Sequence, residues 1–280
     1  MIIWIASYPK SGNTWVRSLI SAYLYGKDGF FDFNLLKKIH QFPSQKYFEF
    51  FLKDFTDMKK VSDHWIAAQE RINLINDGTT ILKTHNALCT FASNPFTNKI
   101  NTKAAIYIVR DPRNLLTSFS HHYSMNIQDT YNYIINKKAW ITAGVDDDEG
   151  IPSILGSWSE HYKSWKNLKF ASLLIIRYED LIFDTKNSFI KIINFLSKFI
   201  EVKFDENKIN NAINTCGFDL LQKKEKEEGF FESVPSKKDK KTLNFFYLGK
   251  KNNWKNLLDP NIEKKTREVF AEEMKELKYI

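Results

Sequence analysis

The loop at residues 8–15 (YPKSGNTW) most constrains the fold of this chain, because it joins an apolar run to a helix. The run before it, residues 1–6 (MIIWIA), is typical of a buried strand. After it, Trp15, Leu19 and Tyr23 recur at helical spacing. Free N–H groups and the helix dipole bind anions at such a junction. We therefore expect a P-loop-like turn that holds a phosphate or sulfate group.

Three further runs indicate an α/β fold. Residues 79–83, 104–109 and 172–177 are short and rich in β-branched or apolar residues, and each is bounded by polar residues. Helical patterns lie between and after them. Strands that alternate with helices predict a central parallel sheet flanked by helices, in a single domain over residues 1–280.

The helical segments are predicted from caps and apolar faces. Pro112 suits a first helical turn capped by Asp111, in a helix that reaches about His122. A second helix, after the strand at residues 172–177, presents one apolar face. Residues 30–75 predict two or three short helices, and residues 222–241, dense in charge, predict a mobile surface segment. The apolar face of the second helix consists of Phe189, Ile192, Ile193 and Leu196.

Net charge, cysteine content and apolar runs limit the cellular location and the binding partners that we expect. The formal charge of +8 favours an anionic partner, whether nucleic acid, a membrane surface or a polyanionic small molecule. Cys89 and Cys216 lack the spacing of a zinc site or a disulfide framework, so we expect reduced thiols and a cytoplasmic location. The apolar start lacks the basic flank of a signal peptide, and no apolar run is long enough to predict a membrane span.

Two other motifs carry candidate chemistry at strand ends. Lys83 ends the second strand and His85 lies two residues further on, at the sheet edge where open α/β sheets bind ligands. A histidine there can take a proton from a hydroxyl, while the lysine holds negative oxygens. Arg110 follows the third strand and can form charge-assisted bonds to a phosphate, to which Ser118 adds a neutral donor.

Together these motifs resemble the cytosolic-type sulfotransferases that use 3′-phosphoadenosine 5′-phosphosulfate (PAPS). The loop resembles their 5′-phosphosulfate loop, with Asn13 where threonine is usual. Lys-Thr-His at residues 83–85 matches a family motif, and Arg110 with Ser118 resembles the 3′-phosphate motif. The last motif departs from the family, because Tyr247 and Leu248 replace a basic pair. Lys250 or Lys251 is our candidate to take over its role.

The resemblance implies sulfuryl transfer from PAPS to a hydroxyl or amine of a small-molecule acceptor by in-line displacement. It implies His85 as general base, with Lys10 and Lys83 neutralising charge on the group in transfer. Stacking on adenine is expected from Trp15, Tyr178 and Phe218. No metal is expected, because the sequence shows no ligand cluster. The candidate cofactor-binding residues are Lys10, Ser11, Gly12, Asn13, Thr14, Trp15, Arg110, Ser118, Tyr178, Phe218, Gly249 and Lys250.

Two other functions compete with this interpretation. A P-loop-like kinase would need a Gly-Lys-Ser/Thr sequence and an acidic metal ligand. Here the lysine precedes the glycine, and Asp111 and Asp180 are poor candidates for that ligand. Nucleic-acid binding is the second alternative, which we consider weaker. Oligomeric state and the identity of the acceptor stay open. The lysines that would contact a nucleic acid are Lys237, Lys238, Lys240 and Lys241.

Overall fold

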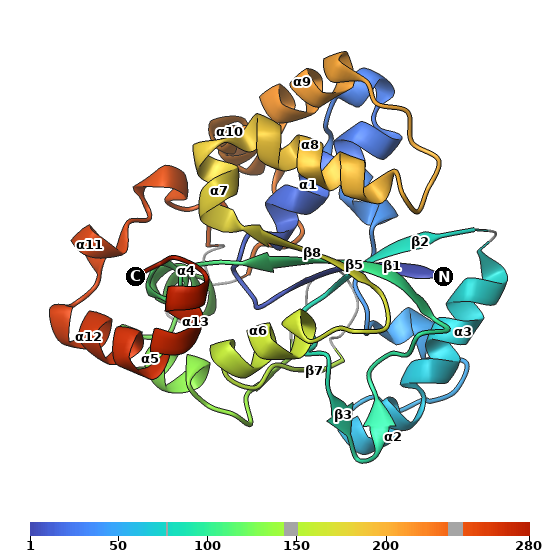
Figure 1. Cartoon of the computed structure of the whole chain (residues 1–280), viewed down its shortest axis with the longest axis horizontal. Helices are drawn as coiled ribbons and strands as arrows, with labels where there is room; N and C mark the ends of the chain where they lie inside the picture. Colours follow the sequence, from blue (N-terminus) through green and yellow to red (C-terminus); the bar gives the residue numbers. More distant parts are fainter. Residues whose placement is uncertain (77, 143–150, 235–242) are drawn as a thin grey trace.

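A four-stranded parallel sheet forms the centre of the computed structural model (Figure 1), which describes residues 1–76, 78–142, 151–234 and 243–280. The strand order is β2-β1-β5-β8. All four predicted strands are found, with their ends shifted by at most two residues. This confirms the predicted α/β fold. The strands are β1 Ile2–Ser7, β2 Thr80–Thr84, β5 Thr102–Val109 and β8 Ser172–Arg177.

The register of the sheet brings the strand ends together. Ala6 of β1 pairs with Thr84 of β2, and Ser7 pairs with Ile108 of β5. On the other side of β5, Val109 pairs with Arg177 of β8. All four strands of this sheet are parallel, so their carboxyl ends lie at one edge of it.

Each face of the sheet buries its own apolar core. Successive side chains of a strand point to opposite faces, and Ile3 and Ile5 belong to one core cluster while Trp4 belongs to the other. In Figure 1, α1, α8 and α9 lie above the sheet, and α3 and α6 lie below it. The covering helices are α1 Asn13–Tyr25, α3 Trp65–Ile75, α4 Pro112–Tyr123, α6 Trp158–Lys166, α8 Thr185–Leu196 and α9 Glu206–Thr215.

The helix predictions are mostly confirmed. The Asp111 side chain accepts a hydrogen bond from the Arg113 N–H and caps α4, and the four residues of the apolar face of α8 are all buried. Helices occupy residues 30–75, but there are four of them rather than the two or three predicted. The remaining elements are η1 Lys27–Gly29, η2 Phe33–Lys38, η3 Gln45–Tyr47, α2 Met58–Asp63, β3 Thr90–Phe91, β4 Asn94–Pro95, α5 Ile127–Ile134, β6 Trp140–Ile141, β7 Ser153–Ile154, α7 Tyr178–Phe183, α10 Phe218–Glu228, η4 Gly249–Lys251, α11 Trp254–Leu257, α12 Pro260–Val269 and α13 Ala271–Glu276.

The prediction of a mobile surface segment at residues 222–241 is wrong for residues 222–232. Helix α10 continues to Glu228, and the side chains of Glu225 and Glu232 are buried. Both carboxylates accept hydrogen bonds from other parts of the chain, which compensates for the loss of water. Residues 235–242, which include the four lysines considered for nucleic-acid binding, lie outside the described residues.

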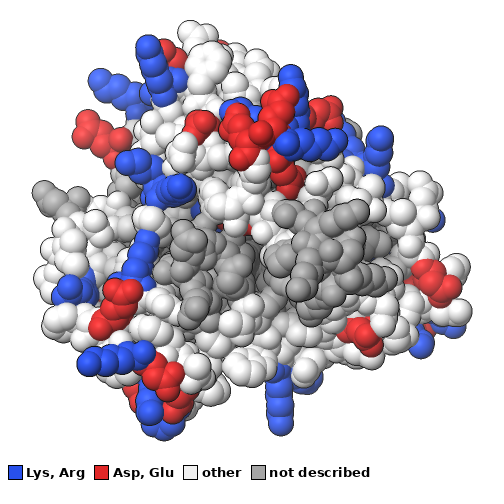
Figure 2. Space-filling model, turned by 180° about the vertical axis from the view of Figure 1, so that it is seen from behind, with Lys and Arg blue, Asp and Glu red and all other residues white. Residues whose placement is uncertain are grey.

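The described surface shows no single field of basic charge on the face drawn in Figure 2. Lysine and arginine side chains lie interspersed with aspartate and glutamate there. Among the described residues, none of the helices has the length and apolar character required to cross a membrane.

Candidate active site

The loop at residues 8–15 turns sharply between β1 and α1. Lys10 and Gly12 both adopt left-handed backbone conformations, with φ of 66° and 101°. Gly12 is required, because a Cβ atom there would lie 2.4 Å from the ring of Tyr178. Helix α1 begins at Asn13 and no side chain caps it, so its first N–H groups remain for an anion.

Asn13 fastens this loop to the strand before it. Its side-chain amide donates to the carbonyl oxygen of Ile5 at 3.0 Å and to Ser7 Oγ at 3.2 Å. The side chain therefore points back into the sheet rather than toward the anion site. In Asn13 the chain departs from the usual family pattern, and the structure gives this residue a positioning role.

His85 is held in one orientation by the end of β1. Its Nδ1 atom lies 2.8 Å from the carbonyl oxygen of Ser7. A carbonyl oxygen can only accept, so Nδ1 carries the hydrogen, and Nε2 of the neutral ring keeps a free lone pair. Burial, followed by the nearby charge of Lys83, lowers the pKa of His85 to about 3. The ring is thus neutral at physiological pH.

Lys83 and its neighbours form a buried ionic cluster around Glu232. The Glu232 carboxylate accepts hydrogen bonds from Thr14 Oγ1 at 2.5 Å, from Arg17 Nη1 at 2.5 Å and from Lys83 Nζ at 3.2 Å. No sequence motif singles out Arg17 or Glu232. A local signal exists only for Arg17, which lies three residues after Thr14 and so shares its helix face.

Lys10 is the one cationic residue of the loop at residues 8–15, and its pKa is strongly lowered. Its ammonium group lies 3.6 Å from the centre of the Phe245 ring. Burial lowers the pKa of Lys10 to about 7, an effect that Glu232 opposes and that Arg110 and Lys83 reinforce. Lys10 is therefore only partly protonated at neutral pH, and an anion placed beside it would favour the charged form.

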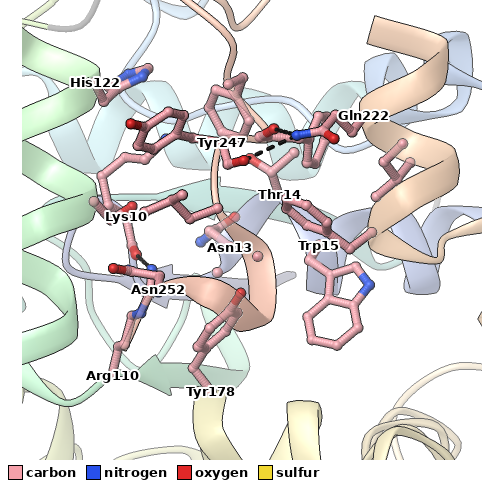
Figure 3. Close-up of a pocket in the computed structure, with 18 of the residues that line it drawn as sticks. Lys10, Asn13, Thr14, Trp15, Arg110, His122, Tyr178, Gln222, Tyr247 and Asn252 are labelled. Atoms are coloured by element: carbon pink, nitrogen blue, oxygen red, sulfur yellow. Dashed lines mark hydrogen bonds between the residues drawn. The ribbon is translucent and has the colours of Figure 1, made fainter. Parts of the chain in front are cut away.

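Arg110 connects the loop to the third strand end. Its Nη1 donates to the carbonyl oxygen of Lys10 at 2.9 Å, and its guanidinium lies 4.3 Å from the centre of the Tyr178 ring (Figure 3). Its Nε is buried and has no hydrogen-bond partner among the described residues. A buried donor of this kind is costly unless a ligand satisfies it, which fits an anion such as a phosphate.

Aromatic side chains border the side of the site near α10. Trp15 packs edge-on against Tyr178 and donates from its indole nitrogen to the Cys216 carbonyl oxygen at 2.9 Å. Phe218 lies against Gly249, where a Cβ atom would approach its ring to 2.6 Å. These faces form a wall of the kind that a purine ring stacks on.

Helix α10 also holds the chain after residue 243. Gln222 Nε2 donates to the carbonyl oxygens of Phe246 at 2.6 Å and Tyr247 at 3.0 Å, as Figure 3 shows. Tyr247 stacks on His121 with ring centres 3.6 Å apart. The position where the family has a basic residue is thus part of an aromatic pair here.

One cavity of about 580 Å³ collects nearly all the predicted residues. Each predicted catalytic or cofactor-binding residue lines it except Ser11, which is fully buried within the loop. His121, His122 and Gln41 also line the cavity, although no motif identifies them. Lys250 and Lys251 both lie at its wall. Within the described part of the chain, no group of His, Cys, Asp or Glu is placed to hold a metal ion.

A family model for the sulfotransferase domain matches residues 2–278 of this chain. The chain belongs to the sulfotransferase family. This confirms the resemblance seen in the motifs and the predicted enzyme class.

Curated relatives and solved structures agree with this membership. This chain is 25% identical over 232 residues to luciferin sulfotransferase of Photinus pyralis, and the match covers 79% of this chain and 56% of that protein. It is 26% identical over 238 residues to 3-alpha-hydroxysteroid sulfotransferase of Cavia porcellus, covering 78% and 72%. The chain thus spans little more than half the length of the first relative. A crystal structure of a mouse sulfotransferase complexed with PAP (3′,5′-adenosine bisphosphate) shares the fold, with a TM-score of 0.59 and 20% identity. The match covers 98% of this chain and 84% of that one.

The close approach of Gly12 to Tyr178 leads to a prediction about stability. Gly12→Ala should lower the free energy of unfolding by about 1–3 kcal/mol more than Gly78→Ala does, as measured by urea denaturation. Gly78 is a matched control, because its φ is 103° but a Cβ atom there would meet nothing within 4 Å. The two positions have nearly the same φ, and of the two only Gly12 has a neighbour that a Cβ atom would meet. Equal losses would show that the contact does not constrain the loop.

Proposed function

We propose that this sulfotransferase moves a sulfuryl group from PAPS to a hydroxyl or amine of a small-molecule acceptor. One observation carries the proposal: three strand ends deliver Lys10, His85 and Arg110 into a single cavity. The uncapped turn of α1 and the unpartnered Nε of Arg110 supply donors for two separate anionic groups. PAPS carries two such groups, at its 5′ and 3′ ends.

In this proposal the loop binds the 5′-phosphosulfate and Arg110 binds the 3′-phosphate, together with Ser118. Tyr178, Trp15 and Phe218 offer faces to the adenine ring. The missing basic pair at Tyr247 and Leu248 is replaced by Lys250, with Lys251 beside it. Both lysines are exposed at the cavity wall, so they can reach a phosphate without a large desolvation cost.

We assign the general base to His85. PAPS supplies the sulfuryl group when bound. Nε2 of His85 takes the proton from the acceptor oxygen, which forms a bond to sulfur as the bond from sulfur to the phosphate oxygen breaks. Lys10 and Lys83 neutralise charge on the oxygens of the group in transfer, and 3′,5′-adenosine bisphosphate (PAP) is released. The negative charge brought beside His85 raises its pKa, which makes the ring a stronger base at the moment of transfer.

Ligand-induced stabilisation tests the cofactor class. PAP at about 100 times its Kd should stabilise the native state by about 2.7 kcal/mol, measured as a thermal shift. ATP with Mg²⁺, or a DNA or RNA oligomer, should give a much smaller shift. Stronger stabilisation by ATP would favour a kinase, and stronger stabilisation by the oligomer would favour nucleic-acid binding. Phenols, alcohols, amines and sugars incubated with labelled PAPS would then identify the acceptor.

The base assignment predicts a selective loss of turnover in His85→Ala. The rate should fall by about 10²–10⁴-fold with the acceptor found in the screen, while the Kd for PAP changes little. His64→Ala is the control, since His64 does not line the cavity and its Nδ1 also contacts a backbone carbonyl oxygen, that of Lys60, at 2.9 Å. Normal turnover by His85→Ala would rule out the base assignment.

The lowered pKa of Lys10 predicts a pH dependence of PAP binding. The protonated form binds an anion better, and it is lost as pH rises through about 7. Affinity should therefore fall between pH 7 and pH 9, by up to about tenfold per pH unit, with proton uptake on binding. Titration calorimetry in buffers of different ionisation enthalpy measures both effects. Lys10→Arg remains protonated throughout this range, so a slope that persists in this variant would contradict the assignment.

A further inference from the structure

The carboxylate of Glu232 lies where the proposed function needs an anion from outside. The residue is 2% exposed, and its two oxygens contact Thr14, Arg17 and Lys83. Thr14 is the second residue of α1 and belongs to the anion-binding loop. Lys83 is the cation assigned to the group in transfer. Glu232 thus holds two of the side-chain donors that a bound phosphosulfate requires.

The charges at this point explain why the carboxylate is held there. Arg17 and Lys83 are both buried, with side chains 3% and 4% exposed. Burial by itself would raise the pKa of Glu232, but Lys83 and Arg17, with the hydrogen bond from Thr14, outweigh it and hold this pKa well below its usual range. Without an anion, two buried cations would repel each other and lack solvation.

The segment that carries Glu232 is tied to α10 by another buried carboxylate. Glu225 accepts hydrogen bonds from Ser233 Oγ at 2.6 Å and from the N–H groups of Phe245 at 2.5 Å and Phe246 at 3.0 Å. Gly229, where the segment leaves α10, has a φ of 75° and open space where a Cβ atom would lie. The attachment at Ser233 is thus independent of the contacts that Glu232 makes with the loop and Lys83.

We infer that Glu232 is an internal anion that competes with the 5′-phosphosulfate for Thr14 and Lys83, and that it leaves them when the cofactor binds. The inference rests on the proposed function of the cavity. Glu232 compensates the buried cations in the free protein, and its displacement subtracts from the affinity for the cofactor. A permanent counter-ion of Arg17 would instead stay in place and support the site.

Titration of Glu232→Gln with PAP separates these two roles. The amide keeps the shape of the side chain but loses the negative charge, so PAP should bind about tenfold more tightly than to the wild-type protein. The unliganded variant should melt at a lower temperature, because Arg17 and Lys83 lose their compensation. Glu273→Gln is the matched control, since Glu273 is also 2% exposed and pairs with Lys163 at 2.6 Å, outside the cavity. Its affinity for PAP should be unchanged.

Hydrogen exchange in the wild-type protein tests the movement without a substitution. PAP should speed amide exchange in residues 230–234 and slow it in residues 10–16. Slower exchange in both segments, or a Glu232→Gln variant that binds PAP as weakly as the wild-type protein or more weakly, would overturn the inference. This measurement decides the question if Glu232→Gln does not fold.

Inorganic sulfate distinguishes failure of the inference from failure of the proposed function. Both forms of the protein are titrated with sulfate as well as PAP. If PAP binds neither form but sulfate binds Glu232→Gln about tenfold more tightly than the wild-type protein, the cofactor proposal fails while the competition by Glu232 stands. If PAP binds the wild-type protein and neither ligand prefers the variant, the cofactor proposal stands and the inference fails.

Discussion

The parallel register of the sheet is the constraint on which the site depends. Backbone hydrogen bonds fix Ala6 opposite Thr84 and Ser7 opposite Ile108. The residues that follow each strand must therefore emerge at one edge, whatever their side chains are. The loop, His85 and Arg110 meet there because the strands end there, and the apolar cores on both faces hold the strands in place.

That geometry brings several cationic side chains together in a buried place, which is unfavourable. Two features of the structure reduce this unfavourable energy. Burial pushes Lys10 toward its neutral form, whereas Lys83 and Arg17 are compensated by the Glu232 carboxylate. Both features leave the cavity able to accept an anion. Lys10 can take up a proton, and in our inference Lys83 can release the Glu232 carboxylate. In the proposed function, the cavity must be stable when empty as well as when it holds a highly charged nucleotide.

The sequence allowed the local parts of this site to be predicted, and missed the parts that depend on distant contacts. The loop, the Lys83 to His85 segment and Arg110 are each recognisable from a strand end and a few following residues. Glu232 lies 218 residues after Thr14, and only the folded chain brings the two together. Its segment is dense in charge, which favours a solvated state unless partners are known. The same limit applies to Tyr247, whose aromatic partner His121 comes from α4.

The bond from Arg110 to the carbonyl oxygen of Lys10 links the two ends of the proposed nucleotide site. The backbone of Lys10, whose carbonyl oxygen accepts this bond, is left-handed. Arg110, which we assign to the 3′-phosphate, thereby helps to fix the loop at residues 8–15, which we assign to the 5′-phosphosulfate. In the proposed function, a nucleotide without a 3′-phosphate would leave Arg110 without its second partner and the turn less firmly set. The presence or absence of the 3′-phosphate would then affect how the loop holds the 5′ end of the nucleotide, where the reaction takes place. The connection would run through one backbone carbonyl, that of Lys10.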